Sequence, residues 1–282
     1  MILVTGASGL LGSAVTQDLR LSELEYQVLD RSFFDPETVP HLNNFVRRTP
    51  TVIIHLAAAV PQLPRSIDNE SLASVTRAID VRVASAARDW GSRLVYLSGC
   101  SLYASADPNV KTEDSPLQSR PCSPYLRAKL EGDKVAQTLP SHAVLRISSP
   151  LSPRLPSRTV AAQFVRRAVD NKMLEVWGSG RREQDFVDVI DVAICIRQAA
   201  LSGAIGVFNV TSNRATTMTE LAHAVVRAAT GGHVVFSNRP DPLDEQQARF
   251  CNEKSQRAFS WQPGISLEES LDRMVAQYRL EH

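Results

Sequence analysis

Two residues suited to acid–base chemistry, Tyr125 and Lys129, lie four positions apart in a run of strong helix formers that follows Pro124. Residues four apart share one face of a helix, so the phenol and the ammonium are expected to lie together. A nearby ammonium stabilises the phenolate and lowers the pKa of a tyrosine, which then exchanges protons near neutral pH. The pair predicts proton transfer at a substrate oxygen. For an isolated pair, the alternative is a surface tyrosine beside a helical lysine.

A glycine-rich turn near the N-terminus is suited to hold a dinucleotide. Residues 1–4 have the pattern of a parallel strand buried on both faces, and helical apolar spacing begins at Ser13. Between them, a glycine at every third position lets the backbone turn sharply and approach a pyrophosphate, while the helix N-terminus offers unpaired N–H groups to the anion. The residues expected to bind the cofactor here are Gly6, Ser8, Gly9, Leu10, Leu11 and Gly12.

An acidic residue follows the next apolar run, residues 26–29. Asp30 lies at about the twenty-residue distance expected for a carboxylate that accepts hydrogen bonds from the adenosine ribose. Arg31 could instead pair with a 2′-phosphate. Because strand, glycine turn, helix, strand and acid follow in this order, the sequence predicts a dinucleotide site that favours NAD and leaves NADP open.

Residues 51–59 form a third apolar run, which ends in small side chains. Small residues at the carboxyl end of a strand leave room for a ligand at the sheet edge, so Leu56, Ala57 and Ala58 are expected to lie against the cofactor. His55 could be a ligand or a base. A single histidine that closes an apolar strand is instead expected to be a hydrogen-bonded packing residue.

The composition is that of an ordinary globular protein: of 282 residues, 43% are hydrophobic and 22% charged, enough for one α/β domain with a smaller lobe. The net charge is +1 and the basic residues are scattered, so no nucleic-acid partner is expected.

No segment is long enough to span a bilayer and the N-terminus lacks a basic leader, so we expect a cytoplasmic protein without membrane contact. The four cysteines lack metal-ligand spacing, so we expect reduced thiols and no metal site.

Strand and helix patterns alternate up to residue 150, which predicts an α/β fold with a Rossmann-type doubly wound parallel sheet. Residues 1–150 are expected to form an NAD(P)-binding domain. Residues 151–282 are expected to form mainly a smaller C-terminal substrate-binding lobe, with some segments that return to the first domain. Helices are predicted near residues 38–47, 70–90, 125–131, 159–171, 190–201, 219–230 and 267–278, and later strands near 93–98, 142–147, 184–189 and 207–210. A short strand and turn is predicted at 174–180, and a further short segment at 233–237.

Together these residues resemble the extended short-chain dehydrogenases/reductases, in the branch of NAD-dependent nucleotide-sugar epimerases, dehydratases and deoxysugar ketoreductases. Further marks of the resemblance are Leu145-Arg146, Gly178-Ser179-Gly180 and Asp185-Phe186-Val187. The resemblance implies that Tyr125 is the acid/base at a substrate hydroxyl or carbonyl, and that Lys129 holds the nicotinamide ribose and lowers the pKa of the tyrosine. Hydride would pass between the nicotinamide and the carbon that bears this oxygen. The family also implies a homodimer, formed by two long helices and their symmetry mates.

The predicted catalytic centre departs from the family pattern at Gly99. This glycine stands where a serine or threonine hydroxyl usually donates to the substrate oxygen, and it has no side chain to donate. Either Ser98, Cys100 or Ser101 takes that role after a shift, or the tyrosine acts without a second donor, at a loss of about a few kcal/mol. Ser98 is also expected to contact the cofactor, as are the tyrosine and the lysine.

Three other positions depart from the pattern. Thr76 replaces the helix asparagine that is associated with proton relay. Ser149 replaces an asparagine near the substrate diphosphate, and Gln184 replaces an arginine, whose planar charged fork pairs with phosphate in a way that an amide cannot reproduce. The arginines that could supply the charge instead are Arg154, Arg181, Arg182 and Arg239. The link between the second and third strands is also shorter than in most epimerases of the family, so the resemblance implies that Ser32 and Phe33, rather than a loop aspartate, lie near the adenine.

The sequence thus predicts an NAD(P)-dependent oxidoreductase of the epimerase/dehydratase type, which acts at a secondary alcohol or ketone of a small-molecule substrate. A nucleotide-linked sugar is expected, with epimerisation or 4-keto reduction as the reaction. Ser149 and Gln184 motivate a non-sugar ketone as the alternative, and Gly99 and Thr76 motivate a non-catalytic dinucleotide-binding protein. The direction of reaction and the choice among reduction, dehydration and epimerisation stay open.

Overall fold

The computed structural model describes residues 1–29, 46–59, 69–104, 109–118 and 123–282. At its centre is a parallel sheet of six strands in the order β2-β1-β3-β4-β5-β9. The strands are β1 (Ile2–Thr5), β2 (Tyr26–Leu29), β3 (Val52–His55), β4 (Arg93–Gly99), β5 (His142–Ile147) and β9 (Gly206–Val210). β1 pairs with both β2 and β3, so the sheet winds outward from this point, and open α/β sheets bind ligands at the carboxyl ends of such strands. The predicted Rossmann-type fold is confirmed.

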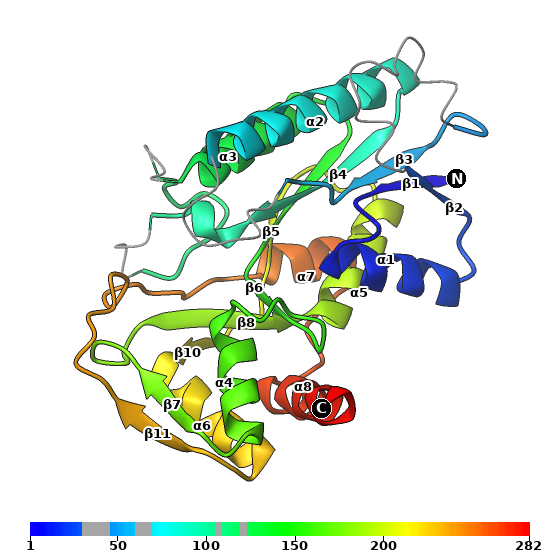
Figure 1. Ribbon diagram of the computed structural model, residues 1–282. Helices are drawn as coiled ribbons and strands as arrows, with labels where there is room; N and C mark the ends of the chain where they lie inside the picture. The colour runs from blue at the N-terminus through cyan, green and yellow to red at the C-terminus, as the bar shows by residue number, and fades with distance from the viewer. Residues whose placement is uncertain (30–45, 60–68, 105–108, 119–122) are drawn as a thin grey trace.

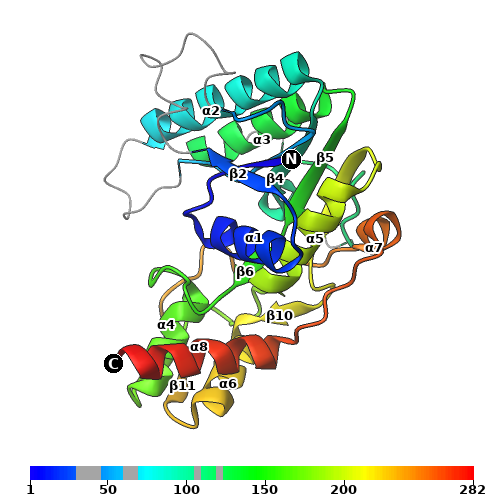
Figure 2. The same ribbon diagram turned by 90° about the vertical axis from the view of Figure 1, so that its right-hand side faces the viewer.

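Helices cover both faces of this sheet (Figures 1 and 2). The helices of one face are α2 (Asn69–Trp90) and α3 (Pro124–Gln137), and those of the other are α1 (Leu10–Leu21) and α5 (Val189–Leu201). Successive residues of a strand point to opposite faces. Leu3 therefore packs toward α2 and α3, whereas Ile2 and Val4 pack toward α1 and α5. This burial on both sides explains why the strands are uninterrupted apolar runs.

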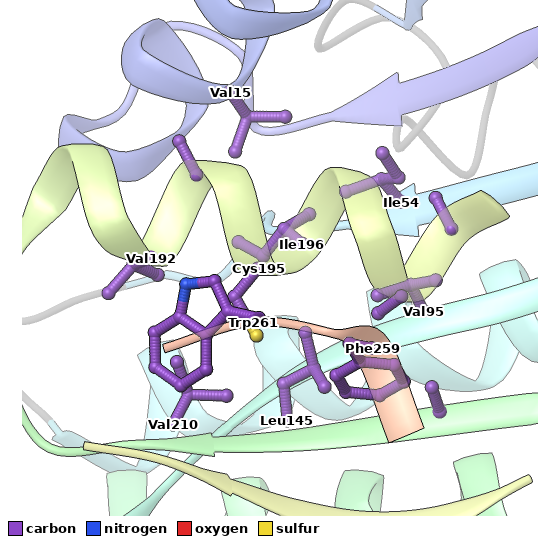
Figure 3. Close-up of a cluster of buried hydrophobic side chains, with 14 of the residues drawn as sticks. Val15, Ile54, Val95, Leu145, Val192, Cys195, Ile196, Val210, Phe259 and Trp261 are labelled. Atoms are coloured by element: carbon purple, nitrogen blue, oxygen red, sulfur yellow. The ribbon is translucent and has the colours of Figure 1, made fainter. Parts of the chain in front are cut away.

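The C-terminal segment contributes to the core on the α1 and α5 side. Figure 3 shows Ile196 of α5 close to Phe259 and Trp261, which lie at and just after the end of the short helix α7 (Glu253–Phe259). The indole N–H of Trp261 donates to the carbonyl oxygen of Asp191 at 3.0 Å, so its buried polar atom is satisfied. Residues far apart in the sequence thus complete one core.

The remaining elements form a second, smaller region beside the sheet (Figure 1). One small sheet has the order β10-β8-β6, and a two-stranded sheet pairs β11 with β7. These strands are β6 (Ser149–Leu151), β7 (Met173–Val176), β8 (Glu183–Asp188), β10 (Ala215–Thr217) and β11 (His233–Phe236). The helices α4 (Val160–Val169), α6 (Met218–Ala229) and α8 (Leu267–Glu281) share a second buried cluster that includes Phe164, Leu221 and Leu271. Capping boxes start α6 and α8, at Thr217 with Glu220 and at Ser266 with Glu269.

Most of the predicted elements are present with ends that differ by a few residues, but β6, β10 and α7 were not predicted. Strands of three residues and a helix of seven are too short to show a hydrophobic period. β3 ends at His55, so the small residues after it lie in the loop beyond the strand. The helix expected at residues 38–47 falls mostly outside the described residues. Across the described part of the chain, no helix is long and apolar enough to cross a membrane.

Candidate active site

The glycine turn between β1 and α1 is packed so closely that side chains cannot replace two of its glycines. Gly6 has a φ of +70°, and a Cβ there would lie 2.6 Å from the backbone nitrogen of Ala57. A Cβ at Gly12 would overlap the carbonyl oxygen of Gly6 and lie 2.6 Å from the Cα of Ala7. The absence of these side chains lets β1, α1 and the end of β3 meet at one point.

The same turn leaves open space at the start of α1. Gly9 is the residue before the helix, and among the described residues a Cβ there would meet only the carbonyl oxygen of Gly6, at 3.2 Å. The first-turn N–H groups of a helix have no partner within the helix, and they attract an anion. A cradle that a Cβ would fill, next to these N–H groups, fits a dinucleotide pyrophosphate. Of the other residues predicted to bind the cofactor, Ser8 belongs to this turn, and Leu10 and Leu11 are the first residues of α1.

The carboxyl end of β3 borders the glycine turn. Leu56, Ala57 and Ala58 are half-buried there, and the backbone N–H of Ala59 donates to the hydroxyl of Thr76 at 3.0 Å. Thr76 therefore anchors this loop to α2. The predicted adenosine-binding residues Asp30, Arg31, Ser32 and Phe33 lie outside the described residues.

Tyr125 and Lys129 lie in the first turns of α3, which begins with Pro124 as its first residue. Tyr125 is half-buried, and Lys129 is buried with 8% of its surface exposed. The ammonium of Lys129 donates to the Tyr96 hydroxyl at 2.7 Å and lies 4.1 Å from the centre of that ring. Lys129 is thus bound to a tyrosine of the sheet that the sequence analysis had not singled out.

The predicted lowering of the pKa of Tyr125 is wrong for this structure. Burial raises the pKa of Tyr125, and the nearby carboxylate of Asp80 raises it further. Burial lowers the pKa of Lys129, against which the negative charges of Asp80 and Asp133 act. These effects come from burial and from residues outside the shared face of α3, so the spacing of Tyr125 and Lys129 does not reveal them.

A buried carboxylate, Asp80 of α2, is at the centre of the polar groups around this helix. It accepts a hydrogen bond from the Tyr96 hydroxyl at 2.8 Å and lies 2.9 Å from Nε2 of His55, whose Nδ1 is 2.6 Å from the hydroxyl of Thr5. Both ring nitrogens of His55 are therefore paired, as expected for a packing residue. A signal for Asp80 is present in the sequence, because it is an acid on the helix face that also carries the buried residues Thr76 and Ala84.

Ser98 and Cys100, at the end of β4, are turned into the core. The Ser98 hydroxyl donates to Asp133 at 2.7 Å, and the Cys100 thiol donates to the carbonyl oxygen of Arg146 at 3.2 Å. Burial raises the pKa of Cys100 well above its usual value and keeps it a thiol. The structure thus does not support either side chain as a donor to a substrate.

Gly99 and Ser101 are placed differently. Gly99 has φ −144° and ψ 144°, an extended conformation that any residue can adopt. A Cβ on Gly99 would lie 3.2 Å from the hydroxyl oxygen of Ser101, in the short helical turn η3 (Cys100–Leu102). Ser101 is exposed, and no group in the described part of the chain hydrogen bonds to its hydroxyl. Of the three alternatives for the second donor, Ser101 therefore has the free hydroxyl.

A buried ion pair fixes α3 against the sheet. Arg146 of β5 donates to both carboxylate oxygens of Asp133, at 3.0 and 3.1 Å. Its guanidinium also donates to the hydroxyl of Tyr103 at 3.2 Å, which in turn donates to Asn209 of β9 at 2.7 Å. Buried charges are tolerated when they are paired in this bidentate way. Asp133 lies one helical turn from Lys129, so the pair sets the position of the helix that carries the candidate catalytic residues.

The predicted substrate residues are divided between two places. Ser149 is the first residue of β6 and pairs with Phe186 of β8. Gln184 lies in the same strand, two residues before Phe186. Arg182 and Arg239 lie instead at the turn around Gly178, whose N–H donates to the Arg239 carbonyl at 2.9 Å. The side chain of Arg182 forms an ion pair with Asp241 at 3.2 Å. The side chain of Arg239 forms an ion pair with Glu175 at 3.6 Å, and its guanidinium lies 5.5 Å from the ring centre of Trp177.

Asp185 links the two regions of the chain. This buried carboxylate of β8 accepts hydrogen bonds from the hydroxyl of Ser148, which follows β5, and from the backbone N–H of Ser212, which follows β9, at 2.8 Å. Burial raises its pKa, against which these donors act. The edge of the main sheet and the smaller region are thereby held together beside Ser149. In the described ranges, no group of histidines, cysteines and acids has an arrangement that could hold a metal ion.

Comparison with known proteins relates this arrangement to a family. A family model described as "NAD dependent epimerase/dehydratase family" matches residues 2–211. The UDP-glucose 4-epimerase of Mycolicibacterium smegmatis is 26% identical over 313 residues, covering 98% of this chain and 98% of that protein. UDP-glucuronic acid decarboxylase 1 of Xenopus tropicalis is 24% identical over 316 residues, covering 100% of this chain and 73% of that protein.

Solved structures share the fold over the whole chain. The UDP-glucose 4-epimerase of Thermotoga maritima, solved with UDP-glucose, has a TM-score of 0.82 at 23% identity and covers 99% of each chain. RMD of Pseudomonas aeruginosa, complexed with NADPH, has a TM-score of 0.85 at 20% identity and covers 100% of this chain and 99% of that one.

Proposed function

The chain belongs to the NAD-dependent epimerase/dehydratase family, and from this we propose that it is an NAD(P)-dependent enzyme acting at a secondary alcohol or ketone of a nucleotide-linked sugar. The reaction we propose is epimerisation or reduction of a 4-keto group. The observation that carries the proposal is the position of Tyr125 and Lys129: they lie on α3, and α3 packs on the sheet whose carboxyl edge holds the glycine cradle.

Each part of the site has a role in this reaction. The glycine cradle and the N-terminus of α1 would hold the pyrophosphate of the dinucleotide, and Lys129 the nicotinamide ribose. When bound, the dinucleotide supplies or accepts the hydride. In reduction, the phenol of Tyr125 gives its proton to the substrate oxygen as the carbonyl carbon gains hydride. In oxidation, the phenolate takes the hydroxyl proton as the same carbon loses hydride.

We assign to Ser101 the second hydrogen bond to the substrate oxygen. Gly99 has no donor, and the side chains of Ser98 and Cys100 are bound to partners in the core. The hydroxyl of Ser101 is exposed beside the position that a side chain at residue 99 would occupy. A donor aimed at a developing oxyanion contributes about 3 kcal/mol, so its presence decides between efficient and residual catalysis.

Two observations support a sugar-nucleotide substrate: the names of the relatives, and two arginines at the turn around Gly178. Relatives over the full length of this chain are named for UDP-glucose and UDP-glucuronic acid chemistry. Arg182 and Arg239 lie in the smaller region, where they are paired with Asp241 and Glu175. Ser149 belongs to β6 and Gln184 to β8 of the same region. Gln184 and Ser149 also favour a second candidate, reduction of a ketone that carries no diphosphate, because neither residue pairs with phosphate as arginine does.

Cofactor binding and substrate panels test this proposal. Titration with NADH and NADPH, followed by cofactor fluorescence, should give saturable binding, and a panel of UDP-, GDP- and dTDP-linked sugars and keto-sugars should then oxidise the cofactor or be epimerised. Tyr125→Phe should abolish turnover and leave cofactor binding intact, because it removes only the phenolic hydroxyl. Undiminished turnover in this variant would refute the assigned role. Tight cofactor binding without turnover on any sugar or ketone would instead favour a binding-only protein.

Assembly and location are part of the proposal. We expect a homodimer through α2 and α3, because Val75 and Val81 of α2 are exposed apolar residues beside a second long helix. Light scattering of the purified protein would show a monomer if this is wrong. We also expect a cytoplasmic protein with reduced cysteines, which fractionation of the source cells would check.

A further inference from the structure

A chain of buried hydrogen bonds leads from Lys129 to the end of β3. The ammonium of Lys129 donates to the Tyr96 hydroxyl at 2.7 Å, and this hydroxyl donates to Oδ2 of Asp80 at 2.8 Å. The other oxygen of Asp80 lies 2.9 Å from Nε2 of His55. The side chains of His55 and Asp80 are 1% and 2% exposed, so water does not compete for these bonds.

The direction of the hydrogen bonds identifies Asp80 as the acceptor at the centre of the chain. The Thr5 hydroxyl oxygen accepts from the N–H of Ala57 at 3.3 Å, so its own proton is available to Nδ1 of His55. We assign the remaining imidazole proton to Nε2, from which it points at Asp80. The carboxylate thus receives donors from two sides, and its negative charge faces the Lys129 ammonium across a single hydroxyl.

Helix α3 leaves space for these hydrogen-bonded side chains at Gly132. Gly132 lies in the middle of α3, where glycine is less favourable than alanine by about 1 kcal/mol. A Cβ at Gly132 would overlap both Oδ2 of Asp80 and the hydroxyl of Tyr96, and it would lie 2.8 Å from Cζ of that tyrosine. The missing side chain is therefore the space into which the carboxylate and the hydroxyl fit.

We propose that Asp80 and Tyr96 are positioning residues for Lys129: the carboxylate, acting through the tyrosine hydroxyl, holds the ammonium in one place and keeps it charged. The inference rests on the proposed function, in which Lys129 holds the nicotinamide ribose. A lysine tail has three rotatable ammonium donors on a flexible stem, so it needs fixed acceptors to have one position. A buried ammonium also needs a nearby negative charge to stay protonated.

The charged and titratable groups around Lys129 come from three elements. Asp80 comes from α2, Tyr96 from β4, and Tyr125 and Asp133 from α3 itself. Asp133 is already held by both ends of the Arg146 guanidinium, so its charge is largely balanced. In the described part of the chain, no lysine or arginine side chain is bonded to Asp80, whose partners are the Tyr96 hydroxyl and the imidazole of His55. Asp80 is therefore the carboxylate whose negative charge stabilises the Lys129 ammonium.

Two variants separate the charge from the hydroxyl. Asp80→Asn removes the negative charge that raises the pKa of both Tyr125 and Lys129. Alcohol oxidation needs Tyr125 deprotonated and Lys129 protonated, so its pH profile has a rising and a falling limb that are set by these two pKa values. Both limbs should therefore move to lower pH, by about one unit. Tyr96→Phe keeps the ring beside the ammonium but removes the acceptor, so only the limb that is set by Lys129 should move.

A second readout does not depend on turnover. NADH binding should weaken with rising pH as Lys129 is deprotonated, and in both variants this weakening should begin at lower pH than in the unsubstituted protein. Asp89→Asn, an exposed acid on the same helix, is the matched control and should follow the unsubstituted protein. Thermal unfolding of each variant shows whether it is folded, and Tyr96→Phe, the milder change, decides the matter if Asp80→Asn does not fold.

The outcomes distinguish failure of the inference from failure of the proposed function. If the unsubstituted protein binds no NADH, the proposed function fails. If it binds NADH and turns over, but both variants lose stability or rate with neither limb displaced, Asp80 and Tyr96 are structural and the inference is overturned. The inference is supported if the limbs of the pH profile move in the variants while the profile of the Asp89→Asn control stays unchanged.

Discussion

A serine introduced at Gly99 is expected to raise the rate of the enzyme rather than harm it. The backbone at Gly99 is extended, with φ −144° and ψ 144°, so a side chain causes no backbone strain. The new Cβ would lie 3.2 Å from the hydroxyl oxygen of Ser101, which is closer than most such contacts. Since Ser101 is exposed, its hydroxyl can turn away by a few tenths of an ångström.

The size of the effect follows from the number of donors at the substrate oxygen. Replacing glycine stabilises a folded protein by about 0.4–1 kcal/mol, because it lowers the conformational entropy of the unfolded chain. This gain offsets the cost of the close contact, so the free energy of unfolding should change by less than about 1 kcal/mol. One well-placed donor to an oxyanion contributes about 10²- to 10³-fold in kcat. With Ser101 already in place, Gly99→Ser should add about tenfold. Without it, in Ser101→Ala, the same change should restore about a hundredfold.

Single-turnover oxidation of NADH by a keto-sugar measures this directly, because it isolates the chemical step from product release. Gly99→Ala is the matched control, since it adds the Cβ without a hydroxyl and should leave the rate unchanged or lower. The reasoning is refuted if Gly99→Ala accelerates the reaction as much as Gly99→Ser. It is also refuted if Ser101→Ala alone leaves the single-turnover rate intact, because Ser101 would then not be the donor.

Four further outcomes are expected. Gly12→Ala should abolish NADH binding measured by fluorescence, because its Cβ would overlap the glycine turn, whereas Gly203→Ala, with open space around it, should bind normally. Gly132→Ala should lower the free energy of unfolding in urea by about 2 kcal/mol despite the better helix propensity of alanine, and a stabilised variant would contradict the packing described for α3. Asp133→Asn should lower it by about 3–5 kcal/mol, since it leaves the buried Arg146 guanidinium without its partner, and a loss below about 1 kcal/mol would show that the pair does not fix α3. Because burial and Asp80 raise the pKa of Tyr125, alcohol oxidation should speed up with pH through the neutral range while ketone reduction stays nearly level. Equal pH slopes in the two directions would contradict the assignment.

The fold could be predicted from the sequence because its signals are local. The glycine turn, the apolar runs and the helix after Pro124 each depend on neighbours within a few residues, and each is present in the structure. β6 and β10 could not be predicted, because three-residue strands form only through the pairing with β8 that tertiary structure brings about.

The site was predicted less completely, for a physical reason. The spacing of Tyr125 and Lys129 showed that they share a helix face, and this is true of the structure. The groups that determine their protonation come from elsewhere: Asp80 is nearly fifty residues before Lys129 in the chain, and Tyr96 belongs to a strand. Electrostatic effects depend on burial and on distance in space, and a sequence read element by element contains neither.

The protonation of Tyr125 bears on the direction of the proposed reaction. At neutral pH a phenol with a raised pKa stays protonated, and Lys129, which would stabilise its phenolate, is bound to Tyr96 instead. Tyr125 is therefore ready to give a proton to a carbonyl oxygen and poorly prepared to take one from an alcohol. Of the two proposed reactions, this protonation state suits reduction of a 4-keto group, so a keto-sugar is the substrate to test first.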